Sequence, residues 1–123
     1  MEFYASIKCT KAELPAFKNP LTISRLPEFC ASVTSVLSDK KVRGTIHCLW
    51  GEFKINREEL KYGVRFSLPD CPNTLSWSVT LDQPSKTALI HLITNKKTLD
   101  ADFIISIEQF INDWSDGIKI SGI

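Results

Sequence analysis

The sequence GVRFSLPDCPNTLSWSVTL, residues 63–81, contains two segments in which apolar and polar side chains alternate, joined by a rigid loop. Residues 64–68 and 75–81 place an apolar side chain at every second position, which is the period of a half-buried β-strand. The loop at 69–73 contains two prolines, whose rings fix φ and remove backbone donors. This stretch therefore predicts two strands of one sheet with a single face toward a core.

The same alternation continues on both sides of this stretch. It predicts further strands over residues 2–9, 42–50, 52–56 and 87–94. The apolar phase shifts by one residue at Gly51, which is typical of a bulge or a tight turn. The charged segment 56–61 has the composition of a hairpin tip. Short connections between consecutive strands favour an antiparallel meander.

Two segments have helical periodicity instead. In residues 26–38 the apolar side chains recur at helical spacing, Pro27 suits an early helical position and Ser24 is a candidate cap. The β-branched residues in this segment weigh against a helix, because they lose χ1 freedom there. Their positions are Val33, Thr34 and Val36.

The second segment, residues 101–116, has the stronger helical pattern. Asp100 stands at the N-cap position, and Leu99 and Ile104 have the spacing of a hydrophobic staple. Gly117 is a good left-handed terminator. The apolar stripe consists of Phe103, Ile104, Ile107, Phe110, Ile111 and Trp114.

Together these elements predict an α+β fold in a single domain, residues 1–123. We expect an antiparallel four- to five-stranded meander sheet with two helices, at about 26–38 and 101–116, packed on one face. The face toward the helices carries Ile46, Trp50, Phe53, Phe66, Trp77 and Val79. The opposite, solvated face carries Arg43, Thr45, His47, Lys54, Arg65, Ser67, Ser76, Ser78 and Thr80.

Composition is that of an ordinary globular protein, with 43% hydrophobic residues and a net charge of +1. No apolar run reaches the roughly 18 residues of a membrane helix, and residues 1–4 lack the features of a secretory signal. We therefore expect a cytoplasmic protein without membrane contact, whose four cysteines are free thiols. Charge is uneven, since residues 1–97 carry 14 basic and 9 acidic side chains and residues 98–123 carry 1 and 5.

Known catalytic and cofactor patterns are missing from the sequence. His47 and Cys48 are adjacent on a predicted strand, so their side chains point to opposite faces and cannot share a metal ion. No cysteine or histidine pair has the spacing of a zinc site, and the dispersed glycines form no phosphate loop. The sequence thus predicts neither a metal nor a cofactor.

Two alternatives stay open. Cys71 lies on a loop and would act as the nucleophile of a hydrolase or transferase if His47 or His91 approached it in the fold. The basic residues of the body would support weak electrostatic binding of nucleic acid. Against the second alternative, the open face has no stacking aromatics and the pI is about 7.7.

The sequence favours a non-enzymatic interaction module of the inhibitor, immunity or adaptor type, which binds another protein stoichiometrically. Charge asymmetry and the lack of a reactive cluster support this interpretation. The sequence is also compatible with a homodimer, because an edge strand such as 2–9 can pair with its copy across a two-fold axis. The residues predicted to contact a partner are Arg43, His47, Lys54, Arg65, Asp113 and Asp116.

Overall fold

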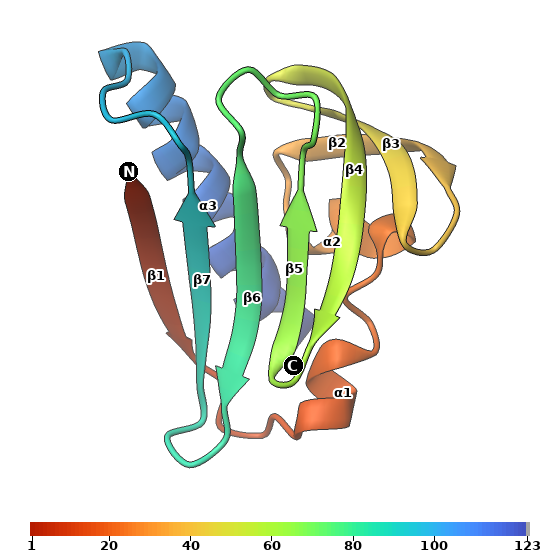
Figure 1. Cartoon of the computed structure of the whole chain (residues 1–123). Helices are drawn as coiled ribbons and strands as arrows, with labels where there is room; N and C mark the ends of the chain where they lie inside the picture. Colours follow the sequence, from red (N-terminus) through yellow and green to blue (C-terminus); the bar gives the residue numbers. More distant parts are fainter. Residues whose placement is uncertain (123) are drawn as a thin grey trace.

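A computed structural model describes residues 1–122 of the chain as one curved antiparallel sheet with helices on one side (Figure 1). The first strand, β1 (Glu2–Lys8), is followed by short helical segments, six further strands and a long helix. The short segments are α1 (Leu14–Lys18), a 3-10 turn (Ile23–Arg25) and α2 (Leu26–Phe29). The later elements are β2 (Val33–Asp39), β3 (Arg43–Cys48), β4 (Gly51–Leu60), β5 (Gly63–Ser67), β6 (Ser76–Asp82), β7 (Thr87–Ile93) and α3 (Ala101–Ser121).

The sheet within the described residues has seven strands in the order β1-β7-β6-β5-β4-β3-β2. Strands β2 to β7 form a continuous meander, and β1 joins it as an edge strand beside β7. The predicted α+β class and antiparallel meander are confirmed. The predicted four to five strands were too few. Residues 33–39 form a strand that was predicted as a helix, and β1 and β7 both belong to the same sheet as the central strands.

The predicted helix at 26–38 is wrong beyond residue 29. After the single turn of α2, the chain becomes extended, and residues 33–39 form the edge strand β2. The β-branched Val33, Thr34 and Val36 suit the pleated conformation, which leaves their χ1 angles unstrained. Pairing with β3 satisfies backbone hydrogen-bonding groups along this segment.

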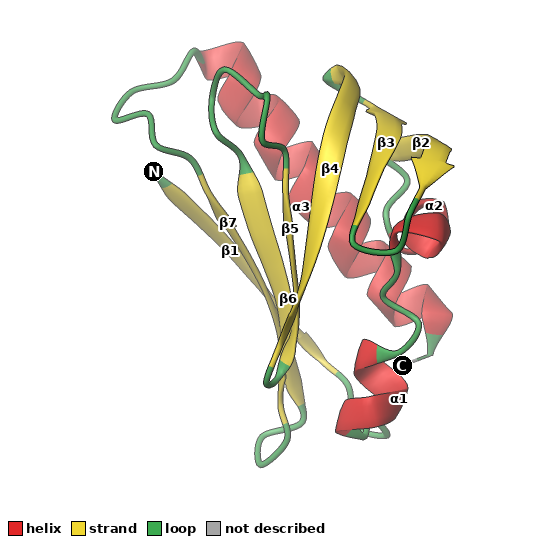
Figure 2. Ribbon diagram, turned by 45° about the vertical axis from the view of Figure 1, so that its right-hand side comes forward, coloured by secondary structure: helices red, strands yellow, loops and turns green. Residues whose placement is uncertain are grey.

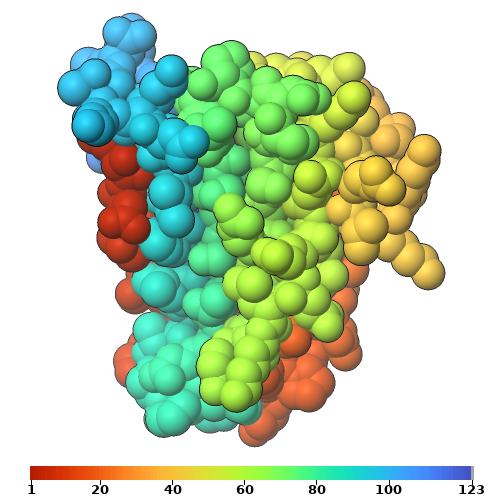
Figure 3. Space-filling view, viewed as in Figure 1, coloured from red at the N-terminus to blue at the C-terminus, as the bar shows by residue number. Residues whose placement is uncertain are grey.

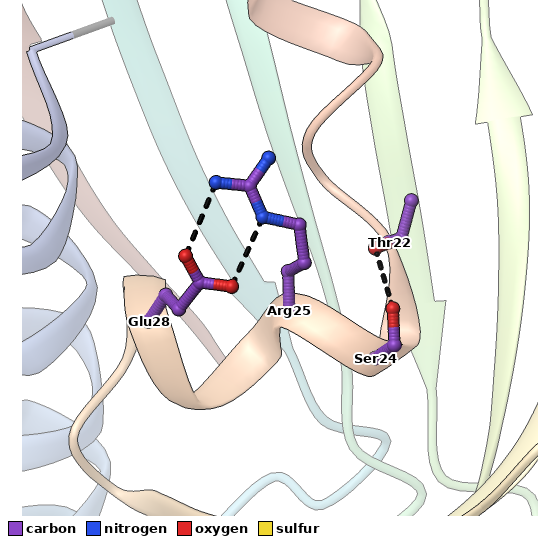
Figure 4. A network of polar contacts seen from close by, with 4 residues as sticks. All are labelled: Thr22, Ser24, Arg25 and Glu28. Carbon is purple, nitrogen blue, oxygen red and sulfur yellow. Dashed lines mark hydrogen bonds and ion pairs between the residues drawn. The ribbon is translucent and has the colours of Figure 1, made fainter.

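Polar contacts at the surface surround the start of α2 (Figure 4). The Arg25 guanidinium donates to both carboxylate oxygens of Glu28, at 3.0 and 3.1 Å, and this hydrogen bonding lowers the pKa of the Glu28 carboxyl. Ser24 caps no helix, because the N-cap positions of the 3-10 turn and of α2 are Thr22 and Arg25 and neither end has a side-chain cap. The Ser24 hydroxyl lies 3.2 Å from the Thr22 hydroxyl instead. The cap predicted at Ser24 was therefore wrong.

Strand β4 is longer than the alternation predicted. It runs unbroken to Leu60, so the hairpin tip predicted at 56–61 is wrong, and the chain reverses at residues 61–62. Arg57 accounts for part of the charge in this segment: its Nε donates to the backbone oxygen of Leu21 at 2.7 Å. The phase shift at Gly51 is confirmed as a tight turn, with a φ of +115°.

Helix α3 crosses the concave side of the sheet and buries the predicted apolar stripe against it (Figure 2). Trp77 of β6 contacts Phe110 edge-on, with ring centroids 4.8 Å apart. Phe66 of β5 lies 5.6 Å from Trp77 and 6.2 Å from Trp114. We call these four side chains the aromatic cluster. Each is at most 1% exposed. Of the predicted core face, Ile46, Phe66, Trp77 and Val79 are buried, whereas Trp50 and Phe53 are partly buried.

Gly117 lies inside α3 and does not end it, contrary to the prediction. The helix continues to Ser121, and Gly122 takes the left-handed capping conformation with a φ of 76°. A Cβ atom at Gly117 would lie 1.9 Å from the backbone oxygen of Phe29. The glycine is therefore required by the close approach of α3 to α2.

We predict that Gly117→Ala lowers the free energy of unfolding by about 1–3 kcal/mol, because the added methyl forces α3 away from α2. Alanine would otherwise stabilise a helix interior by about 1 kcal/mol relative to glycine. Urea unfolding followed by circular dichroism measures the effect. Asp116→Ala, at the exposed neighbouring position, is the control and should leave the midpoint unchanged or raise it.

Candidate functional site

The side of the sheet opposite α3, which we call the outer face, is the candidate site. Figure 3 shows that strand side chains form this surface and that none of the described helices crosses it. Cross-strand pairing places Tyr4, His91, Ser78, Arg65 and Glu58 in one row over five strands. The outer face is thus continuous from β1 to β4.

One end of this row holds an aromatic stack. The rings of Tyr4 and His91 are 4.4 Å apart and nearly parallel, at 7°. The His91 Nε2 atom lies 3.0 Å from a carboxylate oxygen of Glu2. Tyr4 is 58% exposed, so its ring forms an accessible apolar surface beside a polar group. Such amphipathic rings are enriched at protein interfaces.

Arg65, one of the predicted contact residues, lies in this row on β5, the middle strand of the sheet. Its guanidinium donates to the Ser76 hydroxyl at 3.2 Å and lies 3.7 Å from the Glu58 carboxylate. These partners orient the group, and about half of the side chain stays accessible. Arg65 is therefore a preoriented cation at the middle of the open sheet.

The other three predicted bases lie on the same face, toward β3. Lys54 is 4.0 Å from the Asp70 carboxylate, and the His47 ring nitrogen is 3.0 Å from the Thr34 hydroxyl. Arg43 and His47 lie on β3, opposite Asn56 and Glu52 of β4. The structure thus brings Arg43, His47, Lys54 and Arg65 to one surface, where acidic side chains alternate with them.

The prediction of Arg43, His47, Lys54 and Arg65 as contact residues did not include the acidic side chains between them. Carboxylates of Glu52, Glu58 and Asp70 lie among the four basic residues. A surface with interleaved signs has a weak net potential, and it matches a partner by the position of individual charges. This arrangement differs from the basic groove that follows a nucleic-acid backbone.

The two acidic residues predicted on α3 have different environments. Asp116 is exposed on the helix. Asp113 is partly buried and accepts hydrogen bonds from the Ser32 hydroxyl, at 2.5 Å, and from the Gln109 amide, at 2.8 Å. Its carboxylate joins α3 to the segment between α2 and β2. Helical periodicity placed Asp113 on the outside, but this segment covers it.

Cys71 does not lie beside an imidazole. The residue is 6% exposed and belongs to the hydrophobic core on the α3 side of the sheet. His47 and His91 point from the opposite side, where their contacts are Thr34, Glu2 and Tyr4. Through residue 122, the structure shows no group of three His, Cys, Asp or Glu side chains arranged to hold a metal ion.

All four cysteines are buried free thiols. Burial raises the pKa of Cys9 and Cys48 above the ordinary thiol value of 9.0, and it raises that of Cys30 to about 12. The Cys30 thiol donates weakly to the backbone oxygen of Phe110, at 3.7 Å. A thiol that resists ionisation is a poor nucleophile, so these three cysteines have packing roles.

Sequence reasoning missed two parts of the outer face. Tyr4 and His91 were assigned to strands, but their stacking depends on the pairing of β1 with β7, which joins opposite ends of the chain. An open hollow near the hairpin ends was also missed. Its lining includes Tyr62, Leu81, Pro84 and Leu89.

Comparison of the chain with protein-family models, with curated proteins and with solved structures gives no match. In the part of the chain that the structure describes, no helix has the length and apolar character needed to span a membrane.

We predict that Asp113→Ala lowers the free energy of unfolding by about 1–3 kcal/mol, because it leaves the partly buried Ser32 hydroxyl without its charged acceptor. Urea unfolding of this variant, of Ser32→Ala and of the double variant gives the coupling between the two side chains. Asp116→Asn is the exposed control and should not change stability. Equal effects of Asp113→Ala and Asp116→Asn would contradict the structural role of Asp113.

We also predict that stability falls as pH rises above about 9, because the unfolded chain ionises Cys30 while the folded chain keeps it neutral up to a pKa of about 12. The contribution of this thiol to the slope is about 1.4 kcal/mol per pH unit within that window. Unfolding midpoints between neutral and alkaline pH measure it. Cys30→Ala lacks the thiol and should lose stability less steeply above pH 9; parallel curves would contradict the prediction.

Proposed function

We propose that this protein is a non-enzymatic interaction module that binds a partner protein through the outer face of its sheet. The observation that carries the proposal is the row from Tyr4 to Glu58, in which an exposed aromatic stack and a preoriented arginine lie on an uncovered surface. An inhibitor, an immunity protein or an adaptor would use such a surface stoichiometrically.

The composition of the row supports a protein partner. Tyrosine and arginine are enriched where interfaces concentrate binding energy, since both combine apolar area with directional hydrogen bonds. The Ser76, Ser78 and Thr80 side chains between them are short, so a partner can approach the sheet closely. Basic and acidic groups at fixed positions supply charge specificity.

Burial of the thiols also favours binding over catalysis. A cysteine-dependent hydrolase or transferase needs a thiol in contact with a base and open to its substrate. Cys71 is buried in the core, and both imidazoles project from the other side of the sheet. The interleaved carboxylates give less support to nucleic-acid binding than to protein binding.

Capture of a stoichiometric partner from the native cell extract tests the proposal. The immobilised wild-type protein should retain a partner in a 1:1 ratio. Arg65→Glu with Tyr4→Ser should reduce retention at least tenfold, because the change removes the aromatic surface and reverses the central charge. The matched control is Lys119→Glu with Ile120→Ser, which changes an exposed cation and an exposed apolar residue on α3.

Equal loss of the partner in both double variants, or in neither, would contradict binding through the outer face. Binding to single-stranded or duplex nucleic acid, with an affinity that falls steeply as salt rises, would favour the electrostatic alternative. Turnover of a small substrate that is abolished by Cys71→Ser would favour the enzyme instead.

A further inference from the structure

We propose that β1 pairs with β1 of a second copy of this chain, antiparallel and centred on Ala5, so that two sheets join into one. The strand is an edge, since it pairs with β7 on one side and residues 1–122 place no strand beyond it (Figure 1). An unpaired edge with free backbone groups is a template for a further strand.

The free hydrogen-bonding groups of β1 can be assigned from its pairing with β7. The Cys9 amide donates to the Lys86 oxygen, and the Met1 oxygen accepts from the Thr94 amide. In an antiparallel strand the backbone groups of alternate residues bond to the same neighbour. The N–H and C=O groups of the odd-numbered residues of β1 therefore point toward β7. The outward groups therefore belong to Glu2, Tyr4, Ser6 and Lys8.

Pairing across a two-fold axis at Ala5 uses all four of these residues. Glu2 then lies opposite Lys8 of the second copy, and Tyr4 opposite Ser6, as hydrogen-bonded pairs. Each unlike-charge pair occurs twice, once on either side of the axis. A shift of the axis to Tyr4 or Ser6 shortens the ladder and loses the alignment of Glu2 with Lys8. The charges therefore select one register.

The core side of the strand fits the same arrangement. Phe3 lies opposite Ile7 of the second copy, and Ala5 lies opposite its equivalent. An open hollow of about 430 Å³ beside β1 is lined by Phe3, Tyr4 and Ala5 and, from α3, by Ile104, Glu108, Ile111 and Asn112. A paired strand would lie over this hollow and cover its apolar atoms.

The opposite edge of the sheet differs in the features that prevent pairing. Strand β2 has irregular register at two places, between Val33 and Ser35 and between Val36 and Ser38, and two lysines follow it at 40–41. Bulges and lysines protect an edge from adding a strand. The register of β1 is unbroken over all seven residues, and its charges lie only at its two ends. The fold thus protects one edge and leaves the other regular.

Sedimentation equilibrium of the full chain tests the pairing, with Glu2→Lys, Lys8→Glu and the double variant. The wild type should form a dimer, and each single change should weaken it about tenfold, because it converts two attractive pairs into repulsive ones. The double variant restores both pairs and should dimerise as the wild type does. A wild type that stays monomeric up to millimolar concentration, or a dimer insensitive to the single changes, would overturn the proposal.

Cysteine cross-linking tests the register independently of charge. Ala5→Cys places two thiols directly opposite each other at a non-hydrogen-bonded pair, whose Cα separation of about 4.5 Å permits a disulfide. Mild oxidation should therefore link Ala5→Cys into a covalent dimer. Tyr4→Cys and Ser6→Cys are the matched controls, since neither position lies opposite itself in this register. Faster linkage of either control would overturn the assignment of the axis.

Discussion

Packing of α3 against the sheet through the aromatic cluster is the interaction on which the rest of the structure depends. Trp77 and Phe66 come from neighbouring strands, and Phe110 and Trp114 lie one turn apart on the helix. Each ring removes roughly 150–250 Å² from water, so this contact fixes which side of the sheet is covered. Because α3 occupies that side, the other side is not covered by any helix that the structure describes (Figures 2 and 3).

Strand alternation predicted this division of the sheet. Helical spacing, in contrast, wrongly assigned residues 33–38 to a helix, and the reason is physical. Val33 pairs with Cys48 and Val36 with Ile46, but the register shifts between them. The extra residue of that irregularity converts a spacing of two into a spacing of three, which imitates a helical turn. Single-sequence periodicity cannot separate a bulged edge strand from a short helix, since both place apolar residues at i and i+3.

Candidate site residues were predictable where they depend on local alternation and not where they depend on distant contacts. Arg43, His47, Lys54 and Arg65 follow the period of their strands, and the structure places them on one face. Asp113 follows the period of its helix equally well, yet Ser32, 81 residues away in the sequence, covers it. The Tyr4–His91 stack likewise requires pairing between the first and last strands, for which no local pattern exists.

The two proposed surfaces meet at Tyr4, and this shared position connects them. Tyr4 stacks on His91 within the outer face, and its backbone is one of the free groups at the edge of β1. In a paired sheet the Tyr4 rings of both copies flank the axis, so the two outer faces become one symmetric surface with Arg65 on either side. In the proposed pairing, Glu2 and Lys8 set the register, and Glu2 also contacts His91 of the outer face. Association of copies and recognition of a partner would therefore share side chains at β1, whereas Arg65 would serve recognition alone.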